Sequence, residues 1–140
     1  MQQENKAPYG TGDASFQAAG GEAGIRQLVD DFYDIMASLD ESQHIFNMHP
    51  QGSPEDQPRT RDKLAMFLCG WLGGPIRYAD KYGPISIPRA HAHLPIGAQE
   101  MSAWLRCMKL AADKQPYTDD FKSYLLTQLA VPAGRCKNQD

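Results

Sequence analysis

The sequence predicts an all-α protein, because apolar residues recur at spacings of three and four in four segments and no segment alternates as a strand would. The length of 140 residues suits a single domain, and a hydrophobic content of 41% is enough for one core. Glycines and prolines separate the helical segments. We therefore expect one helical domain over residues 16–132, with flexible tails over residues 1–15 and 133–140.

The first helical segment follows a turn at Gly20 and Gly21. From Gly24 onward, six residues recur at helical spacing and predict one buried face: Ile25, Leu28, Val29, Phe32, Tyr33 and Met36. A short stretch over residues 41–48 can add a turn or two, which must end at His49 because Pro50 follows it.

The second long helix is expected from Arg59, with Ser53 and Pro54 at its entry. Its predicted inner face consists of Thr60, Leu64, Phe67, Leu68 and Trp71. Two glycines and Pro75 end the helix. The connection over residues 76–95 contains three prolines and a glycine, so it is too interrupted for a long helix. Connections of this length are often functional.

The last two helices have clear start signals. Gly97 is the expected cap of the first, and its predicted inner face consists of Met101, Trp104, Leu105, Met108 and Ala112. The second begins near Thr118, because the negative charges of the two aspartates that follow are favourable at the positive end of the helix dipole. Its inward residues are expected to be Phe121, Tyr124, Leu125 and Leu129. Pro132 is expected to stop it.

Composition and motifs exclude several classes of protein. A net charge of -3 disfavours binding dominated by nucleic-acid phosphates. No apolar run reaches the roughly 18 to 20 residues that span a bilayer, and no signal-peptide pattern is present. Glycine-rich phosphate loops, dinucleotide fingerprints, HExxH and GxSxG are absent from the sequence. We expect a cytoplasmic protein that has neither nucleic acid nor membrane as a partner.

The sequence has only four histidines, and two of them, His91 and His93, lie in the irregular connection. Neutral imidazole is a strong iron ligand, so either could hold a metal cofactor, although most histidines are ordinary surface or core residues. Tyr33 and Trp104 each have two interpretations as well. Each is either a core residue whose polar atom bonds to the protein, or a hydrogen-bond donor that points into a ligand pocket. Lys63 and Arg89 could be charged side chains in solvent, or they could pair with acidic groups at the edge of a cofactor.

Several segments together resemble the truncated globins of the second group. They are FYDIM with Tyr33, MHP with His49, KLAMFLCGWLGGP with Phe67 and Trp71, RAH with His91, and AWLRCM with Trp104. The resemblance covers residues 16–131. It implies a two-over-two helical sandwich around a haem b, in which the helix that carries the iron ligand is reduced to a loop with one turn.

The resemblance implies His91 as the iron ligand, because counting forward from Pro75 and backward from Trp104 in the family pattern gives this residue. The family commonly has a basic residue before the histidine and a proline two residues after it, whereas here Ala90 precedes His91 and the His-x-Pro order occurs at His93. His93 is therefore the alternative ligand. Moving the ligand by two residues would require compensation on both sides of a proline-restricted connection.

Other site residues follow from the resemblance position by position. Tyr33, Trp104 and His49 match hydrogen-bond donors on the ligand side of the haem, with Thr60 beside them. Leu64, Phe67 and Met108 are expected to contact the haem. Lys63, Tyr78 and Arg89 are expected near its propionates.

The function that the resemblance implies is reversible binding of oxygen, carbon monoxide or nitric oxide. Oxygen transport or scavenging and detoxification of nitric oxide or reactive species are the expected uses, with a reductase as partner. Two alternatives stay open: a peroxidase-like haem enzyme, because a polar pocket can assist peroxide cleavage, and a haem-free helical sensor or interaction domain.

Overall fold

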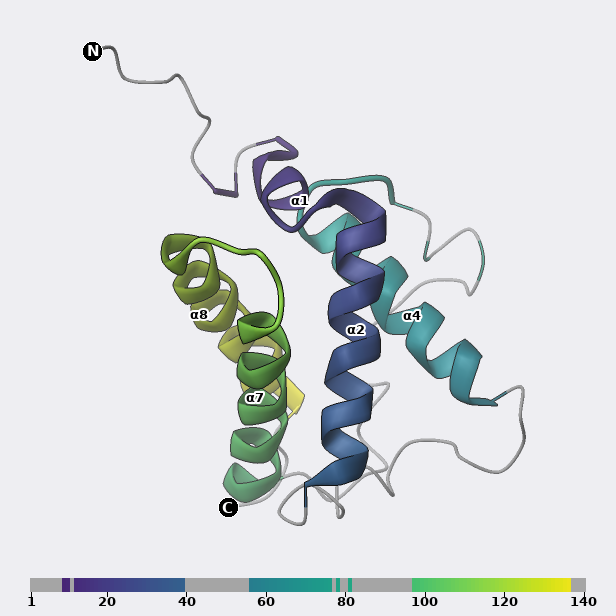
Figure 1. Ribbon diagram of the computed structural model, residues 1–140, viewed down its shortest axis with the longest axis vertical. Helices are drawn as coiled ribbons and strands as arrows, with labels where there is room; N and C mark the ends of the chain where they lie inside the picture. Colours follow the sequence, from purple (N-terminus) through teal and green to yellow (C-terminus); the bar gives the residue numbers. More distant parts are fainter. Residues whose placement is uncertain are drawn as a thin grey trace.

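The computed structural model describes residues 9–10, 12–39, 56–76, 78, 81 and 97–136. Within these residues the chain forms helices and no strand, which confirms the all-α prediction. Helix α2 contacts α4 and α7, and α7 also contacts α8. The long helices thus form two pairs, α2 with α4 and α7 with α8, while the short helix α1 lies at the start of α2 (Figure 1).

Helix α2 (Gly21–Ser38) has the predicted orientation. All six residues of its predicted inner face are buried. This helix can be predicted from sequence because its apolar stripe is wide and its opposite face is polar, so only one orientation buries the apolar side chains.

Helix α4 (Asp56–Trp71) begins three residues before the expected Arg59 and includes Pro58 in its first turn. Proline is tolerated there because the first backbone N–H groups of a helix have no partner within it. The buried face of α4 differs from the predicted one and consists of Ala65, Leu68 and Cys69, continued by Leu72. Of the four predicted inner-face residues whose side chains the structure describes, Leu68 is fully buried, whereas Leu64, Phe67 and Trp71 are half-buried.

Helix α7 (Ala98–Asp113) begins at the predicted cap, where the Gly97 N–H donates to the Glu100 side chain at 2.7 Å. Its buried face also differs from the predicted one, although Met108 and Ala112 of that face are buried. The buried residues are mostly small: Ala103, Cys107, Met108, Ala111 and Ala112. Trp104 and Leu105 are only half-buried. Small side chains allow close contact with the neighbouring helices, and this tertiary requirement sets the orientation.

Helix α8 (Asp119–Cys136) begins as predicted, with the Thr118 hydroxyl accepting from the Phe121 N–H at 3.1 Å. Phe121, Leu125 and Leu129 are buried. The helix does not stop at Pro132 but continues through Cys136, so the predicted tail over residues 133–140 is helical at its start. Proline removes one backbone hydrogen bond without ending the helix here.

The predicted tail over residues 1–15 also does not extend to residue 15. Helix α1 (Ala14–Ala18) begins inside it, Ser15 is buried, and the Tyr9 ring lies 4.9 Å from that of Tyr124 on α8. The chain meets the turn after α4, where a side chain on Gly73 would collide with the Gly12 carbonyl and one on Gly74 with the Phe16 ring. These partners are more than 50 residues apart in sequence, which is why composition did not indicate the contact.

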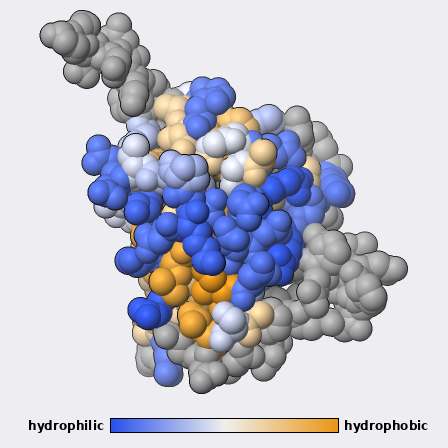
Figure 2. Space-filling model, viewed as in Figure 1, coloured by the Kyte–Doolittle hydropathy of each residue, from blue (hydrophilic) through white to orange (hydrophobic). Residues whose placement is uncertain are grey.

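The described surface is largely hydrophilic on the face shown in Figure 2, with one apolar area in its lower half. Among the residues that the structure describes, no helix has the length and hydrophobicity needed to cross a membrane.

Candidate functional site

Tyr33 lies near the middle of α2 and is 6% exposed. Its ring meets the Phe32 ring edge to face, with centroids 5.0 Å apart at an interplanar angle of 70°. The Arg61 guanidinium lies 5.6 Å from the Tyr33 ring centroid. Burial raises the pKa of the Tyr33 phenol well above its usual value, and the nearby Arg61 charge opposes this only in part. The hydroxyl therefore keeps its proton at neutral pH and can donate a hydrogen bond.

Trp104 lies on α7 and contacts the same phenylalanine. Its ring centroid is 5.1 Å from that of Phe32, at an interplanar angle of 66°. Phe32 is fully buried, so one core ring positions Tyr33 from α2 and Trp104 from α7. The structure thus brings together, through Phe32, two of the predicted hydrogen-bond donors.

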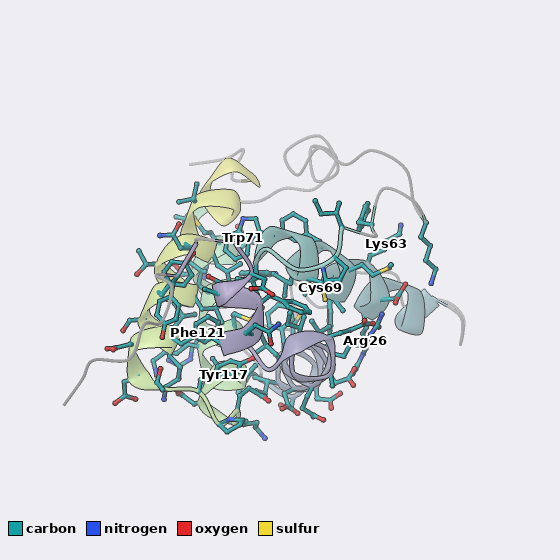
Figure 3. The ribbon with its side chains drawn as sticks, turned by 90° about the horizontal axis from the view of Figure 1, so that it is seen from above. Arg26, Lys63, Cys69, Trp71, Tyr117 and Phe121 are labelled. Carbon is teal, nitrogen blue, oxygen red and sulfur yellow. The ribbon has the colours of Figure 1, made fainter. Side chains whose placement is uncertain are left out.

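A second apolar face of α4 carries the large side chains Leu64, Phe67 and Trp71, all half-buried. The Phe67 and Trp71 rings are stacked with centroids 6.2 Å apart at 23°. In Figure 3, Lys63 and Trp71 lie on the side of α4 away from α2, whereas Cys69 lies toward α2. Large apolar side chains that the described helices cover only in part suit a flat apolar group such as a haem. The residues present therefore fit the cofactor that the sequence predicts.

The remaining predicted haem contacts differ in how far their side chains are buried. Met108 is fully buried one turn after Trp104 on α7. Lys63 is exposed on α4, and Tyr78 is half-buried beyond the end of that helix. An exposed lysine can reach an anionic group at a pocket edge from several positions. Contacts of Lys63 and Tyr78 with a propionate stay predictions.

Several predicted site residues lie outside the described residues. They are His49, Arg89, His91 and His93, together with the side chain of Thr60, whose backbone belongs to α4. The choice of His91 over His93 as iron ligand therefore stays a prediction. Among the described residues, no three His, Cys, Asp or Glu side chains gather in a way that could hold a bare metal ion.

Sequence reasoning missed Arg61, which connects α4 to α2 beside Tyr33. Its guanidinium lies within 3.2 Å of Asp30 and 2.9 Å of Asp34. A signal was present in the sequence, because Asp30 and Asp34 lie one turn apart on the exposed side of α2, next to Tyr33 in the helix. The basic partner could not be identified, because it comes from another helix.

Comparison with known proteins gives consistent matches over nearly the whole chain. The family model described as "Bacterial-like globin" matches residues 14–133. The group 2 truncated hemoglobin YjbI of Bacillus subtilis (strain 168) is 33% identical over 127 residues, which cover 91% of this chain and 90% of that protein.

Two solved structures are similar in fold. A group II 2-on-2 hemoglobin from the plant pathogen Agrobacterium tumefaciens has a TM-score of 0.83 at 28% identity, covering 99% of this chain and 100% of its own. A truncated oxygen-avid haemoglobin from Bacillus subtilis has a TM-score of 0.75 at 31% identity, covering 89% and 98%. The match to the 2-on-2 structure confirms the predicted two-over-two fold.

Proposed function

Because this chain belongs to the bacterial-like globins, and among them to the group II truncated haemoglobins, we propose that it binds oxygen and other diatomic gases reversibly at a haem. The family implies a haem iron, and we propose haem b as its type. The observation that carries the proposal is a half-covered apolar face on α4, with a buried, protonated phenol on the neighbouring α2.

When bound, a haem would supply an iron centre that takes up small gases and is held by a histidine. We propose His91 as that histidine, with His93 as the alternative. Leu64 and Phe67 of α4 would provide apolar surface for the ring, together with Trp104 and Met108 of α7. Lys63, Tyr78 and Arg89 hold the propionates through charge or hydrogen bonds.

On the side of the pocket where the gas binds, several hydrogen-bond donors lie among the apolar walls. Tyr33 donates from its hydroxyl and Trp104 from its indole N–H, and His49 and Thr60 complete the set. Such donors stabilise a gas that acquires partial negative charge, so they slow its release. A similar protein described as oxygen-avid supports slow release in this chain as well.

The physiological use that we propose is oxygen scavenging or the detoxification of nitric oxide and related reactive species. Both uses require the iron to be kept reduced, so a reductase is the expected partner. A peroxidase activity would require rapid turnover of peroxide with a reductant, faster than bleaching of the haem. Measuring that ratio separates the enzyme alternative from a gas-binding protein.

The decisive experiment is an absorption spectrum of the purified protein in ferric, ferrous and carbon monoxide-bound states. We expect a Soret band in the wild type, a histidine-ligated spectrum that is lost in His91→Gly, and partial recovery of that spectrum with added imidazole. His93→Gly is the matched control and should keep the wild-type spectrum.

Two outcomes would overturn parts of the proposal. A protein produced with ample haem but without a Soret band would be a haem-free helical domain. Loss of the histidine-ligated spectrum in His93→Gly alone would reverse the assignment of the iron ligand.

A further inference from the structure

The side chain of Arg61, a residue of α4, is held against α2 by three hydrogen bonds. Its Nη1 donates to the Asp30 carboxylate at 3.2 Å and to the Asp30 carbonyl at 3.3 Å, and its Nη2 donates to the Asp34 carboxylate at 2.9 Å. Asp30 and Asp34 are one helical turn apart, so one guanidinium spans both. A planar guanidinium held at both ends has little freedom to rotate.

The Tyr33 ring lies beside the bridge that Arg61 forms between Asp30 and Asp34. Tyr33 follows Asp30 by three residues and directly precedes Asp34, and the guanidinium carbon is 5.6 Å from its ring centroid. The Arg61 side chain is 26% exposed and the two carboxylates 53% and 67%, whereas Tyr33 is 6% exposed. Arg61 therefore lies between the phenol ring and the solvent.

The Tyr33 ring also contacts the buried Phe32, whose ring lies 5.0 Å away at 70°. A tyrosine side chain has two main torsions, so contacts with a ring and with a fixed cation together restrict both of them. The position of the hydroxyl oxygen follows from the ring orientation. A cation beside the ring also makes the phenol a stronger donor, because it stabilises negative charge on the oxygen.

We infer that Arg61 is a positioning residue for Tyr33: by bridging Asp30 and Asp34 it orients the phenol that donates to the bound gas and excludes water from it. This inference rests on the proposed function, because it concerns how Tyr33 acts on a ligand. Arg61 itself does not touch the gas. Its contribution passes through the orientation and the donor strength of the Tyr33 hydroxyl.

The same helix pair offers a matched control in Arg26. Its guanidinium lies 3.0 Å from Glu22 on α2 and 2.9 Å from Asp62 on α4, so it also contacts two carboxylates and joins the two helices through Asp62. Figure 3 shows Arg26 at the junction of α2 and α4. Arg26 precedes Tyr33 by seven residues, or about 10 Å along the helix. Its loss weakens the contact between the helices without removing the cover of Tyr33.

The test combines Arg61→Met, Arg26→Met, Tyr33→Phe and the double variant Tyr33→Phe/Arg61→Met, each loaded with haem. The oxygen dissociation rate should rise about three- to tenfold in Arg61→Met, the effect of a weakened hydrogen bond. It should change less than about twofold in Arg26→Met. In the Tyr33→Phe background, removal of Arg61 should have no further effect, because the hydroxyl through which it acts is gone.

A second measurement needs no bound gas. In protein with ring-labelled tyrosine, Arg61→Met should shift the Tyr33 ring signals and broaden them by faster ring motion, while Arg26→Met leaves them in place. If Arg61→Met does not fold, Arg61→Gln removes the charge with a smaller change in polarity. Arg61→Lys keeps the charge but not the two-ended bridge, and should give an intermediate rate.

The outcomes separate the inference from the function on which it rests. If Tyr33→Phe raises the oxygen dissociation rate but Arg61→Met does not, this inference is wrong and the donor role of Tyr33 stands. An equal effect of Arg61→Met with and without the Tyr33 hydroxyl would also overturn it. No change in Tyr33→Phe would instead overturn the donor role in the proposed function.

Discussion

The two apolar faces of α4 differ in the size of their side chains and in how completely they are covered. The face toward α2 carries Ala65, Leu68 and Cys69, and all of them are buried. The other face carries Leu64, Phe67 and Trp71, which are larger on average and only half-buried. In a helix that packs only against protein, the largest apolar side chains are expected to be the best covered.

This difference indicates that the two faces have separate roles. The small, buried face allows α2 and α4 to pack closely and stabilises the fold. The face with the large side chains provides a surface that the described helices leave half open, and we propose that a haem covers it. The two roles can be separated by substituting matched residues on each face.

The largest effect on stability is expected for Leu68→Ala on the buried face. Removing a fully buried leucine side chain should lower the free energy of unfolding by about 2–5 kcal/mol. Denaturant unfolding of the haem-free protein measures this value. Leu64→Ala, one turn earlier on the half-open face, should cost clearly less, and equal losses for the two variants would contradict the proposed division of roles.

The next effect is expected for haem retention in Phe67→Ala. Loss of an aromatic contact on the half-open face should speed the transfer of haem to a scavenging apoglobin by about tenfold, because less apolar surface is buried against the ring. Phe16→Ala is the control, since Phe16 is also half-buried but packs against the turn at Gly74. Equal acceleration in both variants would argue against a haem on the α4 face.

The third effect is expected for oxygen release in Tyr33→Phe, on the α2 side of the pocket. Losing a donor to a polar ligand should raise the oxygen dissociation rate by about tenfold or more, which stopped-flow mixing measures. Tyr117→Phe provides the control, because its hydroxyl donates to the Ala19 carbonyl at 3.2 Å and stabilises the fold rather than the pocket. A faster oxygen release in Tyr117→Phe would show that the loss of any buried hydroxyl has this effect.

The smallest effect concerns the alkaline stability of the haem-free protein. Burial raises the pKa of Tyr117 to about 12, above the value near 10 of an unfolded chain. The folded state then holds the proton more tightly, so the stabilisation is fully present below pH 10 and is lost as the pH rises toward 12. Tyr117→Phe should show a shallower fall of the unfolding free energy over this range. An unchanged slope would mean that Tyr117 titrates alike in both states.

Much of the fold and part of the site followed from local sequence. The inner face of α2, the cap at Gly97 with Glu100 and the start of α8 at Thr118 all match, because these features depend on residues within one or two turns of each other. The burial of Tyr33 was predicted for the same reason, whereas its role as a donor to the ligand came from the family resemblance and stays a prediction. The family resemblance added the two-over-two fold.

Only the tertiary structure decided the rotation of α4 and α7, the packing of Tyr9 against α8 and the bridge from Arg61 to α2. The period of a helix predicts that an apolar stripe exists, but an apolar stripe wide enough for two partners does not indicate which side meets which partner. That choice depends on close packing between segments far apart in sequence. Local patterns determined the helices of this protein, and contacts between helices determined which side chains remain available for a haem.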